Sequence, residues 1–230
     1  QSRGASEKFH GAVIDHYGGS DTRVFCEVTE VGAALEQLQE VNGSQNPAEA
    51  AVIYDVENRW AVEDAAGPRN AGVFYKETLD KPYQAFRNLG INVDLIDETR
   101  SLDGYRVVAA SMVYLLREGW TEKVRNFVKN GGIFLLTYWS GIVDETDLCY
   151  LGGTPHDLMD VMGFRSMEID GLYDGEWNEV SPEPKNPLHL ERAYRCSHLC
   201  ELVQPSTAEV LMTYGKDFYD GMPAMTRNVY

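Results

Sequence analysis

Short apolar runs alternate with amphipathic stretches over most of this chain. Four continuous apolar runs have the length and composition of buried strands, at residues 51–54, 93–96, 106–110 and 133–137. The helical spacing of Tyr83, Phe86 and Leu89 predicts a helix before the second run, closed by Gly90. This alternation of strand and helix predicts an α/β fold with a parallel sheet covered by helices on both faces, as in flavodoxin-like folds.

Turn residues and caps define further elements after residue 120. Thr121 is predicted to cap a helix that Gly131 and Gly132 end. The residues of that helix expected to face inward are Val124, Phe127 and Val128. A short helix is expected to end at Gly163, and its apolar residues are Leu158, Val161 and Met162. Three prolines within residues 181–187 predict an irregular loop.

The first part of the chain has a different pattern. Asp21 and Thr22 can cap a helix whose apolar residues recur at helical spacing. These residues are Val24, Val28, Val31, Leu35 and Leu38. About 40 residues bury too little surface to fold alone, and the breaker-rich segment 42–47 follows. We therefore expect residues 1–45 to be the end of something larger and residues 46–230 to be a separate domain.

The charge balance narrows the possible partners. The chain of 230 residues has 20 Lys and Arg against 36 Asp and Glu, a formal net charge of -16. Such a balance repels phosphate backbones and anionic lipids, so neither nucleic acid nor membrane is an expected partner. No apolar run has the roughly 20 residues that a membrane helix needs. The four cysteines are too sparse for a disulfide scaffold, which predicts reduced thiols in the cytoplasm.

The predicted fold invites a search for catalytic motifs at the ends of its strands. No glycine-rich phosphate motif follows a predicted strand, so no nucleotide cofactor is expected. The fold also resembles the class I glutamine amidotransferases, whose cysteine nucleophile follows a central strand. Here the third strand leads into Ser111, Met112 and Val113, and the G-x-S-x-G spacing of an exposed serine nucleophile is missing. We therefore do not expect catalysis at Ser111.

Two clusters resemble metal sites without completing one. Cys196, His198 and Cys200 lie close in sequence, but structural zinc normally has four ligands and no second pair is visible. We interpret them as buried thiols beside an exposed histidine. The acidic segment 144–147 lacks the ligand spacing and the turn glycine of a calcium loop. It is interpreted as a solvated or interface loop, and no metal is predicted.

Two polar groups remain as candidate sites. Asp55 and Asn58 follow the first strand, at the sheet edge where open α/β folds usually place ligands. The structural interpretation, which we favour, is that both side chains bond to loop backbone while Trp60 packs beneath them. In the first segment, Glu7 and His10 have the spacing of neighbours on one helix face. Taken alone, that pair indicates an ordinary surface contact.

Several long motifs resemble glycoside hydrolase family 42. Residues 7–12 (EKFHGA) and 21–25 (DTRVF) are similar to the end of its catalytic barrel. The segments similar to its second domain are longer: 54–61 (YDVENRWA), 136–148 (LTYWSGIVDETDL), 151–153 (LGG), 214–219 (YGKDFY) and 223–228 (PAMTRN). The resemblance therefore covers practically the whole chain. It implies the remnant of a (β/α)8 TIM barrel at residues 1–45 and a β-galactosidase trimerisation domain at residues 46–230.

The resemblance also implies an activity and its limits. The parent enzyme would hydrolyse terminal β-galactosides with retention, using two glutamates about 5 Å apart. In the family those glutamates lie on earlier barrel strands, so the resemblance implies that this chain alone is inactive. The family's Glu-x-x-His pair falls on Glu7 and His10, which would bind sugar hydroxyls without breaking bonds.

The second domain of the family implies a homotrimer. Its fold resembles that of the amidotransferases without their nucleophile, and its interface would close a three-fold ring. Trp60, Trp139 and Trp177 are candidate interface anchors, although burial in the core would explain each of them equally well. The alternative function is that of a freestanding, non-catalytic amidotransferase-like or sugar-binding α/β protein. We favour a fragment of the enzyme, because residues 1–45 contain an orphan helix with an open apolar stripe.

Overall fold

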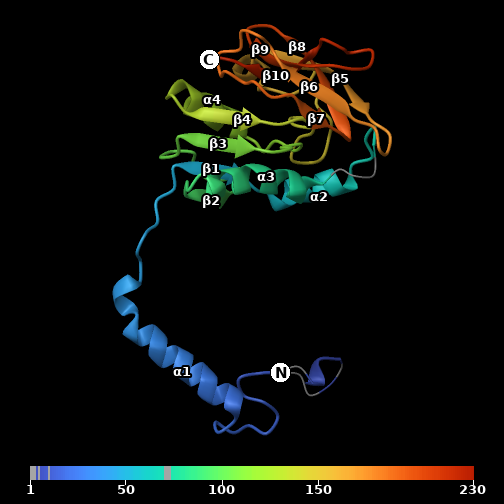
Figure 1. The fold of residues 1–230 in the computed structure, drawn as a ribbon. Helices are drawn as coiled ribbons and strands as arrows, with labels where there is room; N and C mark the ends of the chain where they lie inside the picture. Colours follow the sequence, from blue (N-terminus) through green and yellow to red (C-terminus); the bar gives the residue numbers. More distant parts are fainter. Residues whose placement is uncertain (1–3, 5, 10, 70–73) are drawn as a thin grey trace. The chain divides into compact units, whose positions relative to one another are not determined.

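The computed structural model describes residues 4, 6–9, 11–69 and 74–230 (Figure 1). The chain divides into two compact units, Gln1–Asn46 and Pro47–Tyr230. No helix among the described residues is long and apolar enough to cross a membrane.

The first unit is helical and has no core among its described residues. Its elements are the 3-10 helix η1 (Ser6–Phe9), helix α1 (Arg23–Gln37) and the 3-10 helix η2 (Gln39–Val41). Thr22 caps α1 as predicted, because its Oγ1 accepts a hydrogen bond from the Phe25 amide at 3.3 Å. The predicted stripe is present but exposed, from 39% at Val24 to 63% at Leu35. This unit therefore presents an apolar helix face that its own described residues do not cover.

A parallel sheet forms the centre of the second unit. Its strands are β1 (Ala50–Ile53), β2 (Val93–Ile96), β3 (Val107–Ala110) and β4 (Ile133–Leu136). All three pairings are parallel, and the strand order is β2-β1-β3-β4. All four strands predicted from apolar runs are confirmed, within one residue at each end.

Helices cover both faces of this sheet. On one face α2 (Val56–Asp64) and α3 (Tyr75–Asn88) pack against Val52 and Ala109. On the other face α4 (Trp120–Lys129) and the short α5 (Met159–Met162) pack against Ile53 and Val108. Alternate residues of the central strands are thus buried on opposite faces, which explains why their sequences are continuously apolar.

Two helix boundaries differ from the prediction. Thr121 is not a cap: the cap is Gly119, with a left-handed φ of 76°, so α4 begins at Trp120, two residues earlier than predicted. The Thr121 hydroxyl instead donates to the Asp157 carboxylate at 2.6 Å. Leu89 does not face inward, because it follows the last residue of α3 and is 75% exposed. The short helix α5 ends at Gly163 as predicted.

Antiparallel strands make up most of the chain after residue 163, and the sequence analysis did not predict them. One pair consists of β5 (Phe164–Gly171) and β8 (Leu199–Pro205). A second sheet has the order β10-β9-β6-β7, with β6 (Asn178–Pro182), β7 (Tyr194–Cys196), β9 (Glu209–Tyr214) and β10 (Pro223–Arg227). The predicted loop at 181–187 is wrong at its start, because Ser181 and Pro182 belong to β6. In Figure 1 these strands lie beyond β4.

Candidate functional site

A buried ion pair lies at the carboxyl end of β1. The Asp55 carboxylate caps α2, accepting hydrogen bonds from the amides of Glu57 at 2.9 Å and Asn58 at 3.1 Å. It also accepts two bonds from the Arg117 guanidinium, from Nε at 2.8 Å and Nη2 at 3.0 Å. Asp55 is only 2% exposed, so this fork-shaped pairing compensates a buried negative charge.

Asn58 connects α2 to the segment that follows β3. Its amide nitrogen donates to the Met112 carbonyl, and its amide oxygen accepts from the Leu115 amide, both at 2.9 Å. The prediction of bonds to loop backbone is confirmed for Asn58, whereas Asp55 bonds to the first turn of α2, a helix that the sequence analysis did not predict. The prediction for Trp60 is wrong, because this side chain is 62% exposed on the outer side of α2. The place of Asp55 and Asn58 at the carboxyl end of β1 suggested a ligand site. Their side chains instead make hydrogen bonds within the protein that hold α2 and the segment after β3.

Glu98 adds a second buried carboxyl group to this edge. It follows β2 and is 1% exposed, and its Oε2 accepts a hydrogen bond from the Arg117 amide at 2.9 Å. Its Oε1 has no hydrogen-bond partner among the described residues. Burial raises the pKa of Glu98 to about 8, with the Asp55 charge adding to the effect. Glu98 is therefore mostly protonated at neutral pH, which makes it a poor ligand for a cation.

The turn after β3 has no accessible nucleophile. Ser111 is 1% exposed, and its Oγ has no hydrogen-bond partner among the described residues. Met112 occupies the tight position of the turn, with a φ of 47°, and its side chain is fully buried. A positive φ is unusual for a residue with a side chain. A strained turn therefore follows β3, where the amidotransferases carry their nucleophile. In this chain the residue at the turn is Met112, whose thioether is inert and packs in the core.

The two clusters considered as metal sites have other roles. Cys200 is buried as predicted, whereas Cys196 and His198 are half-buried. The His198 Nδ1 lies 3.2 Å from the Ser197 hydroxyl. Among the described residues, no three His, Cys, Asp or Glu side chains are grouped to hold a metal. In the acidic segment, Asp144 accepts hydrogen bonds within its own loop, and the Thr146 hydroxyl is the main cause of its lowered pKa.

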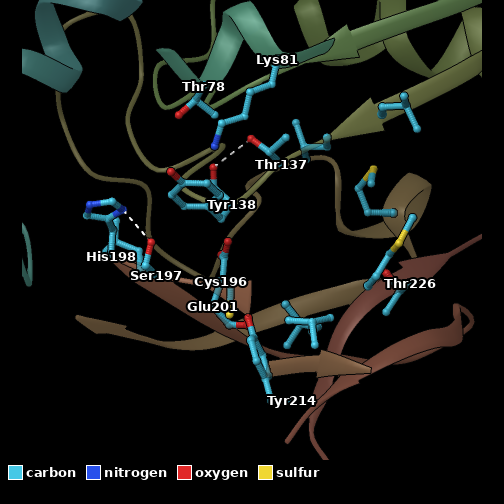
Figure 2. A pocket seen from close by; sticks show the side chains of 18 of the residues that line it. Thr78, Lys81, Thr137, Tyr138, Cys196, Ser197, His198, Glu201, Tyr214 and Thr226 are labelled. Carbon is cyan, nitrogen blue, oxygen red and sulfur yellow. Dashed lines mark hydrogen bonds between the residues drawn. The ribbon is translucent and has the colours of Figure 1, made fainter. Parts of the chain in front are cut away.

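A cleft of about 550 Å³ lies between α3, the end of β4 and the antiparallel strands. Figure 2 shows the amino group of Lys81 reaching toward Thr137 and Tyr138. On the opposite side lies Glu201, which is half-buried and accepts a hydrogen bond from the Trp139 amide at 3.2 Å. Burial raises the pKa of this carboxyl group. The sequence analysis missed this cleft because its lining comes from several separate segments between Phe74 and Thr226.

The candidate sugar-binding pair is not placed by the structure. Glu7 lies in η1, where only its backbone is described, and His10 lies outside the described residues.

The three candidate interface tryptophans differ in burial. Trp139 is 6% exposed and stacks on Tyr114 at 5.8 Å between ring centroids, so it belongs to the core. Trp177 is half-buried, and the Arg195 guanidinium lies 4.1 Å from the centre of its ring. Trp60 has the most exposed ring of the three, beside a shallow groove that also includes Asp147. Only Trp60 therefore offers a largely free aromatic face.

Comparisons with known proteins connect this fold to one enzyme family. Residues 48–230 match the family described as β-galactosidase trimerisation domain, and residues 1–38 match the family described as β-galactosidase. The β-galactosidase BglY of Alicyclobacillus acidocaldarius is 51% identical over 226 residues, which are 98% of this chain and 33% of that protein. The β-galactosidase Pbg of Clostridium perfringens is 50% identical over 228 residues, 99% of this chain and 33% of that protein.

Solved structures give the same result. The cold-adapted β-galactosidase from Rahnella sp. R3 is 50% identical with a TM-score of 0.81, covering 100% of this chain and 34% of that one. The β-galactosidase from Bacillus circulans sp. alkalophilus is 42% identical with a TM-score of 0.81, again covering 100% and 34%. The chain thus spans about one third of the length of the relatives it matches.

Proposed function

The chain belongs to glycoside hydrolase family 42, and from this membership we propose that it is part of a retaining β-galactosidase and serves the assembly of that enzyme into a homotrimer. The enzyme would hydrolyse terminal non-reducing β-D-galactose residues through two glutamates, one as nucleophile and one as acid and base. We place those glutamates outside this chain. The observation that carries the proposal is the match of residues 48–230 to a trimerisation domain.

Details of the sheet support a finer description of the fold. The parallel order β2-β1-β3-β4 and the strained turn at Met112 are features expected of a flavodoxin-like or amidotransferase-like domain. We propose this architecture for residues 46–230, with residues 1–45 as the end of a (β/α)8 barrel. In that barrel Glu7 and His10 would bind galactose hydroxyls. The four free cysteines support a cytoplasmic location. The alternative of a freestanding sugar-binding protein finds no support in the comparisons.

The proposal is tested by the solution mass and the activity of this chain. Light scattering over a dilution series is expected to give three times the 25.8 kDa of one chain, because the assembly surface lies within residues 48–230. A β-galactoside hydrolysis assay on the same sample is expected to show no activity. A monomer at every concentration would contradict assembly by this domain. Hydrolysis would contradict the placement of the glutamates outside the chain.

Trp60 is the side chain that we expect to anchor the trimer. A large exposed aromatic ring on a rigid helix is the type of residue that dominates interface energies. Trp60→Ala is expected to weaken association by about 2 kcal/mol per interface, a roughly thirtyfold increase in the dissociation constant. Light scattering measures this shift. The matched control is Tyr173→Ala, which removes an 80% exposed ring elsewhere in the domain. Equal effects of the two variants would refute a specific role for Trp60.

A further inference from the structure

Cys196 and Cys200 place their sulfur atoms 3.8 Å apart. The two residues belong to different sheets, since Cys196 is the last residue of β7 and Cys200 is the second residue of β8. The chain passes from one sheet to the other through a tight turn, in which His198 has a left-handed φ of 76°. In a continuous strand, residues 196 and 200 would lie too far apart for their thiols to meet. The turn at His198 brings the two sulfur atoms together.

The two thiols have opposite environments. Cys196 is half-buried, and the hydrogen bond from Cys200 is the main cause that lowers its pKa to about 7. Cys200 is 1% exposed, within an apolar cluster that includes Leu172 and Leu202. The hydrogen bond to Cys196 and burial both raise the pKa of Cys200. Both shifts favour ionisation at Cys196 over ionisation at Cys200, so Cys196 is the more readily ionised thiol of the pair.

Access to the two sulfurs is also unequal. Cys196 lines the cleft between α3, the end of β4 and the antiparallel strands, as does Glu201 (Figure 2). Cys200 does not line this cleft. The remaining cysteines, Cys26 and Cys149, are exposed. A small molecule entering the cleft therefore reaches the more nucleophilic thiol first, with a second thiol directly behind it.

We propose that Cys196 and Cys200 form a thiol–disulfide exchange site for low-molecular-weight disulfides. The Cys196 thiolate attacks one sulfur of the small disulfide, forming a mixed disulfide and releasing the other half as a thiolate. That thiolate takes up the proton that Cys200 loses. Cys200 then attacks the Cys196 sulfur and displaces the second half. The protein dithiol is oxidised by two electrons, and the small disulfide is reduced to two thiols.

Oxidised glutathione is a suitable probe. The 230-residue chain is incubated with it near neutral pH, and the remaining thiols are alkylated in denaturant before tryptic digestion. Both cysteines fall in one tryptic peptide, 196–216, because no Lys or Arg lies between Arg195 and Lys216. We expect this peptide to lose two hydrogens and both alkylation sites. Cys26 and Cys149, which lie in other peptides, are expected to stop at glutathione adducts.

Two serine variants distinguish ordered exchange from general oxidation, and tryptophan fluorescence verifies that each is folded. Cys200→Ser is expected to stop at a glutathione adduct on Cys196. Cys196→Ser is expected to leave Cys200 without an adduct and open to alkylation after unfolding. The proposal is overturned if peptide 196–216 stays fully alkylatable while Cys26 and Cys149 form adducts. It is also overturned if Cys200 forms an adduct equally fast in Cys196→Ser.

Discussion

Replacing Arg117 with alanine is expected to lower the free energy of unfolding of residues 47–230 by about 3 kcal/mol. The substitution leaves the Asp55 carboxylate, which is 2% exposed, with only its two backbone donors on α2. Its charge then remains buried without a counter-ion. Urea unfolding followed by tryptophan fluorescence measures the change, and all four tryptophans lie in the second unit. The experiment is done at one protein concentration, because subunit association would itself add stability.

Two controls separate the buried charge from other effects of losing an arginine. Arg59→Ala removes an exposed pair with Glu63 on α2 and is expected to cost less than about 0.5 kcal/mol. The double variant Arg117→Ala with Asp55→Asn keeps a capping oxygen but removes the stranded charge. It is expected to be more stable than Arg117→Ala alone. A double variant less stable than the single one would show that the charge of Asp55 is not the source of the loss.

Glu98 is expected to make the domain less stable as pH rises from about 5 to about 8. Its pKa is raised by burial from the ordinary value of 4.5 to about 8, so in this range the folded state keeps a proton that the unfolded state has lost. Unfolding then releases a proton, and the free energy of unfolding falls by roughly 1.4 kcal/mol per pH unit from this group. Glu98→Gln removes the contribution. The stability of this variant relative to the native chain is expected to increase steadily with pH up to about 8.

The matching control for Glu98→Gln is Glu98→Asp, which retains a carboxyl group and disturbs the packing. It is expected to be less stable at every pH and to keep a decrease in stability as pH rises. Urea unfolding at a series of pH values compares the two variants. If Glu98→Gln shows the same pH dependence as the native chain, another group is responsible and Glu98 is already ionised near neutral pH.

The parallel half of the second unit could be predicted because each central strand is buried on both faces. Val52 and Ile53 face opposite helices, so consecutive positions are apolar and the pattern is unambiguous. The antiparallel half gives no such signal. Strand β5 contains charged residues such as Arg165 and Glu168, and in β6 the prolines after Ser181 suggested a loop. Only the pairing with β8 and β9, distant in sequence, establishes these strands.

The candidate site was predictable only where its residues are close in sequence. Asp55 and Asn58 directly follow a predicted strand, and this place together with their residue types was enough to indicate side chains that bond to backbone. Arg117 and Glu98 could not be found in this way, because their partners are distant in sequence. The Arg117 guanidinium donates to Asp55 after β1, and the Arg117 amide donates to Glu98 after β2. Trp60 was misplaced for a related reason. Its environment depends on which face of α2 packs on the sheet, and a nine-residue helix of mixed polarity does not show this.

The polar network at the carboxyl end of the sheet also affects the entropy of association. Trp60 lies on the short helix α2, whose first turn is fixed to the sheet by Asp55 and to the segment after β3 by Asn58. The backbone that carries the ring is therefore immobilised before any neighbour arrives. Only the side-chain rotations of one tryptophan are left to be lost on binding, a cost of about 0.5–1.5 kcal/mol. The polar bonds that hold α2 in place would in this way lower the cost of forming the interface.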